Sequence, residues 1–148
     1  MNIRTKEITL VSEQVTQCMD ITTLVEQAVA ESGIQEGFIH IMTKHTTTGL
    51  YVNEGLPCVE EDILTHLEVL APEYGNYVHN RYLPFDGCVG FNANAHIKSM
   101  LMGYYLYFPI SQGRVLRGAR QTMYLVEFDG PKTRTFLIQM IGSSMSKP

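Results

Sequence analysis

Three of the five histidines stand at positions where a fold can bring side chains from distant parts of the chain together. His45 ends a β-rich run, His79 lies in a long polar segment, and His96 falls in the first turn of an expected helix. Residues at element ends and in loops carry much of the binding and catalysis in proteins. A neutral imidazole ligates metals and accepts protons, so these residues are candidates for a metal site or for acid–base chemistry. No HxH or HxxxH motif is present, so spacing alone does not prove a shared site.

The other two histidines, His40 and His66, have simpler structural interpretations. His40 interrupts the run GFIHIM, where strand alternation places it on the face opposite Ile39 and Ile41. His66 lies close to the apolar stripe of an expected helix, with Asp62 one turn earlier to accept its N–H. We expect both rings to be satisfied by hydrogen bonds within the fold.

Other polar residues could serve the same chemistry, and each also has a structural interpretation. Glu54 ends a strand and fits a catalytic acid or a cap equally well. The SQGR turn, from Ser111 to Arg114, could present N–H donors to an anion or could simply reverse the chain. Lys98 could contact a phosphate group, although most surface cations are only solvated. The sequence alone leaves these alternatives open.

The composition describes one compact domain and argues against several classes of protein. The 148 residues are 45% hydrophobic and 18% charged, and no run of about 18 apolar residues could span a membrane. The net charge of −4 is spread along the chain, which argues against a nucleic-acid-binding face. The three cysteines are far apart and form no CxxC motif, which favours reduced thiols in a cytoplasmic protein. We expect a single domain over residues 1–148, with neither nucleic acid nor a membrane as a partner.

Apolar periodicity and capping signals predict three helices. Thr23 and Glu26 form a capping-box pair at the start of the first helix, and Gly33 stops it. Asn94 is a plausible cap for the third helix. The expected helices span residues 23–32, 57–70 and 94–102.

Strand patterns cover most of the remaining chain. About seven strands, partly joined by hairpin turns, combine with these helices to predict an α+β domain. A connection at residues 71–92 is rich in Gly, Pro, Asn and Tyr, and a loop of that length is usually functional or part of an interface. The expected strands cover residues 3–10, 37–42, 43–54, 104–110, 115–118, 121–128 and 135–141.

Several motifs, taken in order, resemble those of the YjbQ family. They are KHTTTGLYVNE, EEDI, APEYGNYVHN, NANAHIKSMLMG, GRVLRGARQ and VEFDGPKTR, and they run through essentially the whole chain. The HTT stretch, the Y-x-HN stretch, the AHIKS-x-x-x-G helix and the terminal E-x-DGP-x-x-R turn are the most specific. Proteins of that family are commonly labelled as secondary thiamine-phosphate synthases.

The resemblance implies a fold, an assembly and a site. The fold is a YjbQ-like single-domain α+β sandwich of two β-sheets with flanking helices, and the assembly is a homotrimer. The family's histidines are implied to gather in a cleft with a metal or an anion, and they match His45, His79 and His96. If these rings hold zinc, their nitrogens converge within about 4 Å of one point, since zinc–nitrogen bonds are about 2 Å long. The family's two acids and its glutamine match Glu54, Glu127 and Gln121.

Two features depart from the family pattern. Asn92 and Asn94 stand where an acid or a further histidine is common. Amides are poorer metal ligands than carboxylates, so a fourth protein ligand is in doubt. Arg120 replaces an aromatic residue, which makes a pocket more cationic if the side chain points inward and changes nothing if it faces solvent.

Three functions follow as alternatives. The first is a thiamine-phosphate-synthase-like condensation of a pyrimidine pyrophosphate with a thiazole phosphate, in which the three histidines hold a divalent metal or the leaving group. The second is a metal-dependent hydrolase of a small molecule, with zinc as the ion and Glu54 or Glu127 as general base. The third is a non-catalytic trimer that binds a phosphorylated metabolite or a partner. The expected phosphate contacts are Thr46, Thr47, Lys98, Ser111 and Arg114.

Overall fold

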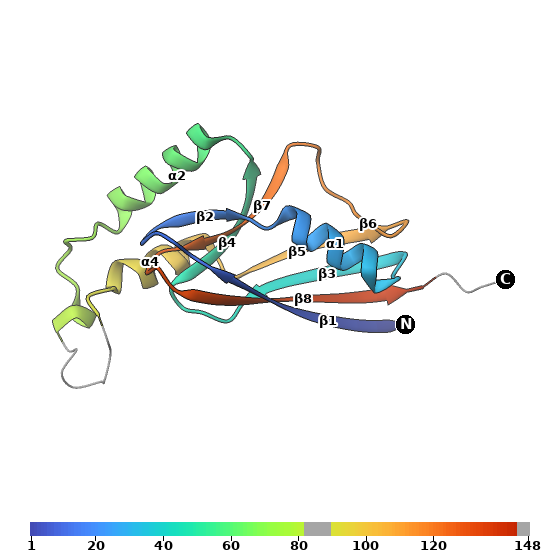
Figure 1. The fold of residues 1–148 in the computed structure, drawn as a ribbon. Coiled ribbons are helices and arrows are strands. Elements are labelled where there is room, and N and C mark those ends of the chain that lie inside the picture. Colours follow the sequence, from blue (N-terminus) through green and yellow to red (C-terminus); the bar gives the residue numbers. More distant parts are fainter. Residues whose placement is uncertain (82–89, 145–148) are drawn as a thin grey trace.

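Two antiparallel β-sheets form the framework of this computed structural model, which describes residues 1–81 and 90–144. The five-stranded sheet has the order β1-β8-β3-β5-β6, and the three-stranded sheet has the order β2-β7-β4 (Figure 1). The expected α+β fold with two sheets is confirmed. The strands are β1 (Asn2–Val11), β2 (Gln17–Asp20), β3 (Glu36–Thr43), β4 (Thr48–Glu54), β5 (Tyr105–Ser111), β6 (Arg114–Val115), β7 (Gln121–Glu127) and β8 (Thr133–Ser143).

The main core gathers the inner faces of both sheets, and strand alternation creates it. Ile39 and Ile41 of β3 are fully buried, as is Phe136 of β8, because every second side chain of a strand faces the same side. Helix α1 (Thr22–Ser32) adds Val25 to the same cluster. Burial of these apolar side chains is the main favourable contribution to folding.

Strand β7 contributes to two cores, because its side chains are buried on both faces. Met123 packs in the main core, whereas Tyr124 belongs to a second cluster with helices α2 (Pro57–Leu70) and α4 (Ala93–Met102). Leu67 of α2 is part of this second cluster. The central strand of the small sheet is therefore covered on both sides, and α4 packs against one of these sides.

The three expected helices are present, but two of the expected caps are wrong. Thr23 makes no capping hydrogen bond, because β2 leads directly into α1 and Asp20 Oδ1 accepts the N–H of Thr22 at 2.8 Å. Helix α4 begins one residue earlier than expected, so Asn94 is a buried helical residue and not a cap. Gly33 ends α1 with a left-handed φ of 73°, as predicted. In the described part of the chain, no helix is long and apolar enough to cross a membrane.

The stretch TKHTTTGLYVNE enters a strand later than expected. Thr43 ends β3 and Thr48 begins β4, and their hydroxyl oxygens form a buried hydrogen bond of 2.6 Å. Residues 44–47 are therefore a short connection that crosses from the large sheet to the small one. His45 lies on this connection and not within a strand.

The face of the five-stranded sheet that points away from the core carries exposed aromatic side chains. Phe38, Tyr105 and Tyr107 are 43%, 48% and 57% exposed. His40 lies on this face and stacks on Tyr107, with ring centroids 4.6 Å apart. The hydrogen bonds expected for its ring stay a prediction. The core-edge position expected for His66 is wrong, because that residue is exposed on α2.

Candidate functional site

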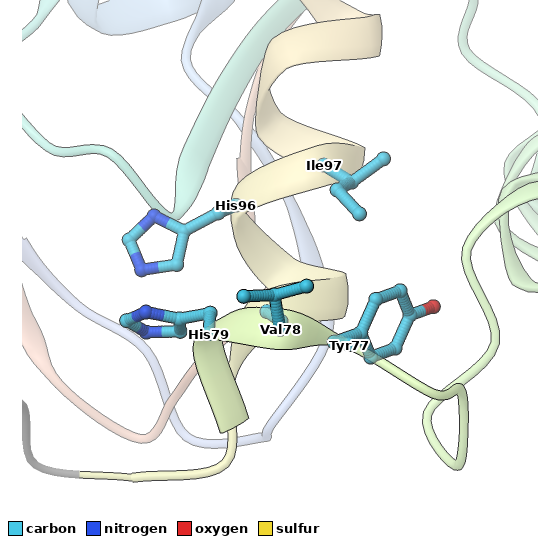
Figure 2. A pocket seen from close by; sticks show the side chains of 6 residues that line it. Tyr77, Val78, His79, His96 and Ile97 are labelled. Atoms are coloured by element: carbon cyan, nitrogen blue, oxygen red, sulfur yellow. The ribbon is translucent and has the colours of Figure 1, made fainter. Parts of the chain in front are cut away.

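Two histidines meet beside the start of α4 and line a cavity (Figure 2). The rings of His79 and His96 lie nearly perpendicular, with centroids 5.2 Å apart and an interplanar angle of 84°. The cavity has a volume of about 350 Å³, and its other walls are mostly apolar. It is lined by Tyr77, Val78, His79, Ala93, His96 and Ile97.

Hydrogen bonds hold together the two segments that carry these rings. His79 lies in a short helical turn, and His96 lies in the first turn of α4. The N–H of Ala93 donates to Asn80 Oδ1 at 3.2 Å, and the N–H of His96 donates to the Asn92 carbonyl at 3.2 Å. Asn80 thus satisfies one of the N–H groups that have no partner within the helix, and it fixes the His79 segment against α4.

A second cavity, of about 440 Å³, shares His96 with the first. Its walls come from the β3–β4 connection, from α4 and from the residue before β5, and they are richer in polar groups. Lys44 adds a positive charge and pairs with Glu7, with 2.6 Å between Nζ and Oε2. Ser99 Oγ donates to the Thr48 carbonyl at 2.6 Å, which fixes α4 against β4. The cavity is lined by Thr43, Lys44, His45, Thr46, His96, Ser99, Met100 and Tyr104.

His45 is held in one tautomer by the backbone of β8. Its Nε2 accepts the N–H of Thr135 at 2.9 Å and lies 3.3 Å from the Thr135 hydroxyl. A backbone N–H only donates, so Nε2 carries no proton and the neutral ring is protonated at Nδ1. Burial and the nearby Arg134 guanidinium lower the pKa of His45, which favours this neutral form.

We expect the protein to lose stability as the pH falls below about 7. The pKa of His45 in the folded protein lies below its ordinary value of about 6.5, so the unfolded chain binds this proton first. The stabilisation that neutral His45 provides is complete when the pH is above the ordinary histidine pKa. It is lost as the pH falls towards the lower pKa of His45 in the folded protein. Urea denaturation at a series of pH values measures this loss. The variant His45→Gln should show a flatter dependence, and an equally steep one would contradict the assignment.

A buried ion pair anchors the connection that carries His45. Glu127 is fully buried and accepts hydrogen bonds from Arg134 Nε at 2.5 Å and from Arg134 Nη2 at 2.7 Å. The same Nη2 donates to Thr47 Oγ1 at 2.8 Å. Burial alone would raise the pKa of Glu127, but hydrogen bonds from Arg134 and from the N–H of Asp129 hold it below its ordinary value. Glu127 and Thr47 therefore have structural roles here, in place of the expected general base and phosphate contact.

Two other candidates lie at the far end of the three-stranded sheet. Glu54 pairs in register with Gln121, whereas Thr48, next to the histidine cavities, pairs with Glu127. The two ends are about six residues, or about 20 Å, apart along the strand. Glu54 instead forms an ion pair with Arg120, whose side chain is 84% exposed. Glu54 and Gln121 therefore do not join the histidines, and Arg120 faces solvent.

The expected phosphate contacts are also divided between distant places. Thr46 lines the second cavity. Lys98 is buried and forms an ion pair with a glutamate on α2. Ser111 Oγ donates to a glutamate of β3 at 2.9 Å, and it lies with Arg114 at the hairpin between β5 and β6, away from the β5 end that borders the cavity. Of the five expected phosphate contacts, Thr46 alone lines the second cavity.

The described residues do not assemble the expected metal site. In residues 1–81 and 90–144, no group of three or more His, Cys, Asp or Glu side chains is placed to hold a metal ion. The Thr135 N–H already occupies His45 Nε2. The expected convergence of three rings on one zinc ion is therefore not met within the described chain.

Sequence patterns do not reveal the polar chain that supports His79. Asn92 Oδ1 lies 3.1 Å from His79 Nε2, and Asn92 Nδ2 donates to Asp129 Oδ2 at 2.9 Å. Asp129 Oδ2 also accepts a hydrogen bond from Lys132 Nζ at 2.5 Å. In the sequence, Asn92 reads as a residue before a helix and Asp129 as part of a DGP turn. Only the fold shows that they touch.

Sequence comparison relates the chain to proteins of one family. The family model described as "UPF0047 protein YjbQ-like" matches residues 6–143. A UPF0047 protein of Archaeoglobus fulgidus is 35% identical over 135 residues, which cover 91% of this chain and 99% of the relative. The UPF0047 protein YugU of Bacillus subtilis is 35% identical over 127 residues, which cover 85% of this chain and 90% of the relative.

Solved structures share the same fold. A YbjQ-like protein of unknown function from Sulfolobus solfataricus has a TM-score of 0.87 at 29% identity, covering 96% of this chain and 99% of the other. A hypothetical protein from Aeropyrum pernix has a TM-score of 0.86 at 31% identity, covering 95% and 99%. With the family model spanning nearly the whole chain, this protein belongs to the YjbQ-like UPF0047 family.

Proposed function

We propose that this protein is a small-molecule enzyme that acts on an organic anion at His96. The observation that carries the proposal is that His96 lines two cavities of different character. The cavity beside His79 is mostly apolar and, at about 350 Å³, suits a small ring or alkyl group. The other cavity carries Lys44, His45 and Thr46, which can attract or donate to an anionic oxygen.

The imidazole of His96 lies where the two parts of such a ligand would join. In ester hydrolysis, His96 accepts a proton from water as the water oxygen bonds to the phosphorus or carbonyl carbon. The bond to the leaving oxygen then breaks, and that oxygen takes up the proton. A positioned acid–base group typically contributes a factor of about 10²–10⁴ to the rate.

The polar cavity suits one small anionic group better than a diphosphate. Neutral His45 offers Nδ1–H as a donor and Thr46 offers a hydroxyl group. Lys44 supplies a positive charge that Glu7 partly neutralises. A phosphate monoester or a carboxylate matches this set of donors.

The three alternative functions expected from the sequence have less support from the geometry. Release of pyrophosphate needs a strongly cationic or metal-bearing cradle, and neither Lys98 nor Arg114 lines the cavities of His96. A metal-dependent hydrolase needs about three protein donors, which the described residues do not group. A binding protein without turnover would accept the same ligands as those proposed here, and the absence of catalysis would distinguish it.

Binding of phenyl phosphate tests the proposal. At about −0.3 kcal/mol per heavy atom, this ligand should bind with a Kd of about 1–10 mM. In an NMR titration, the ring signals of His45, His79 and His96 should shift together and saturate, while exposed His66 should not respond. Inorganic phosphate alone should shift His45 and His96 without moving His79, because the apolar cavity stays empty.

Two surface variants serve as a matched pair for this titration. Lys44→Met removes the cation that lines the polar cavity and should weaken phenyl phosphate binding. Arg114→Met removes a cation at the β5–β6 hairpin and should leave binding unchanged. Equal weakening in both variants, or no saturable shift of the three rings in the wild-type protein, would contradict the proposed site.

A further inference from the structure

The hydrogen-bond chain next to His79 determines which of its ring nitrogens carries a proton. Burial alone would raise the pKa of Asp129, but hydrogen bonds from Lys132 and Asn92 hold it below its ordinary value, so the carboxyl group is ionised. An ionised carboxylate only accepts hydrogen bonds. Asn92 must therefore turn its amide nitrogen towards Asp129, which leaves Oδ1 facing His79.

The amide oxygen of Asn92 is also only an acceptor, so His79 must be the donor. The 3.1 Å contact between His79 Nε2 and Asn92 Oδ1 therefore places a hydrogen on Nε2. In the neutral ring, the basic nitrogen is then Nδ1. His45 has the opposite arrangement, because the Thr135 N–H occupies its Nε2 and its own proton is on Nδ1.

We propose that Asn92 and Asp129 are positioning residues that fix His79 as the Nε2–H tautomer. The two imidazoles that share cavities with His96 then carry their protons on opposite ring nitrogens. His45 carries its proton on Nδ1, as a donor that suits an anionic or carbonyl oxygen, whereas His79 carries its proton on Nε2, where it donates to Asn92. This consequence for the ligand rests on the proposed function, but the tautomers are a property of the protein without a ligand.

The turn between β7 and β8 connects the supports of both rings. The N–H of Asp129 donates to Glu127 Oε1 at 2.8 Å, and Glu127 is paired with Arg134. The residue after Arg134 is Thr135, whose N–H fixes His45. One short segment of chain therefore sets the tautomer of His79 on one side of the site and that of His45 on the other.

Nitrogen NMR of the histidine rings in the ligand-free protein tests this inference. Long-range proton–nitrogen correlations distinguish the two tautomers of a neutral imidazole, so the spectra are compared at alkaline pH. In the wild-type protein we expect the Nε2–H pattern for His79 and the Nδ1–H pattern for His45. Asp129→Ala lets the side-chain amide of Asn92 flip. The ratio of Nε2–H to Nδ1–H tautomer in His79 should then fall about five-fold, with His45 unchanged.

Matched variants separate positioning from a general effect on the fold. Asp129→Asn keeps an acceptor oxygen and Lys132→Met removes only the neighbouring cation, so both should retain the Nε2–H pattern. Asp62→Asn makes the same replacement of aspartate by asparagine at an exposed position on α2, and it is the control for Asp129→Asn. If Asp129→Ala does not fold, Asn92→Leu removes the Oδ1 acceptor of His79 itself with a side chain of similar size, and the same fall is expected.

Two results would overturn the inference. One is an Nδ1–H pattern for His79 in the wild-type protein, and the other is an unchanged pattern in the folded variant Asp129→Ala or Asn92→Leu. A failure of phenyl phosphate to bind would instead overturn the proposed function and would leave the measured tautomers as they are. The two failures are therefore distinguishable.

Discussion

The variant Arg134→Met should unfold with a free energy about 3–5 kcal/mol below that of the wild-type protein. Glu127 is fully buried and takes two hydrogen bonds from this guanidinium group, so the substitution leaves a buried carboxylate without its cation. Removing one partner of a buried pair is costly because the remaining charge keeps its desolvation penalty. Urea denaturation at neutral pH measures the change.

The exposed pair of Arg120 and Glu54 provides the matched control for this experiment. Arg120→Met makes the same substitution in a side chain that is 84% exposed, and it should change the free energy of unfolding by less than about 1 kcal/mol. The double variant Glu127→Gln/Arg134→Met removes both charges and should recover part of the loss. An Arg134→Met protein as stable as Arg120→Met would show that the pair does not anchor the fold.

The variant His96→Gln should lower turnover of a suitable aryl ester by about 10²–10⁴-fold. Glutamine keeps hydrogen-bonding atoms at this position but cannot accept a proton near neutral pH. The aryl group fits the apolar cavity beside His79, and the ester oxygens then lie near His96. Release of p-nitrophenol from p-nitrophenyl phosphate measures the rate.

His66→Gln is the matched control for the loss of an imidazole, because His66 is exposed on α2. It should leave the rate unchanged. Equal trace rates in wild-type protein, His96→Gln and His66→Gln would contradict catalysis at His96. If phenyl phosphate still binds in that case, the protein is a binding protein without this activity.

Much of the fold can be predicted from local patterns. Helix α2 has the expected bounds, because Pro57 favours the first turn and the apolar stripe has helical spacing. Strand β2 cannot be predicted in this way, because four residues with no alternation become a strand only by pairing with β7. The homotrimer and the cytoplasmic location stay predictions.

The sequence predicts part of the site, but it does not predict which strand ends lie close together in the fold. His79 and His96 meet as element ends were expected to, and His45 shares a cavity with His96. Glu54 and Glu127 both end strands, so they look equivalent in the sequence. Antiparallel pairing of β4 with β7 places these two strand ends at opposite ends of the sheet. Register between distant strands is the information that local patterns lack.

The central claim is that one small organic anion occupies both cavities of His96, and a crystal structure of the protein with phenyl phosphate tests it most directly. The account predicts the phosphate group within hydrogen-bonding distance of His45 and Thr46. It predicts the phenyl ring against Ile97 in the cavity beside His79, with the ester oxygen next to His96. A phosphate group bound at Arg114 or Arg120, with both cavities empty, would contradict it.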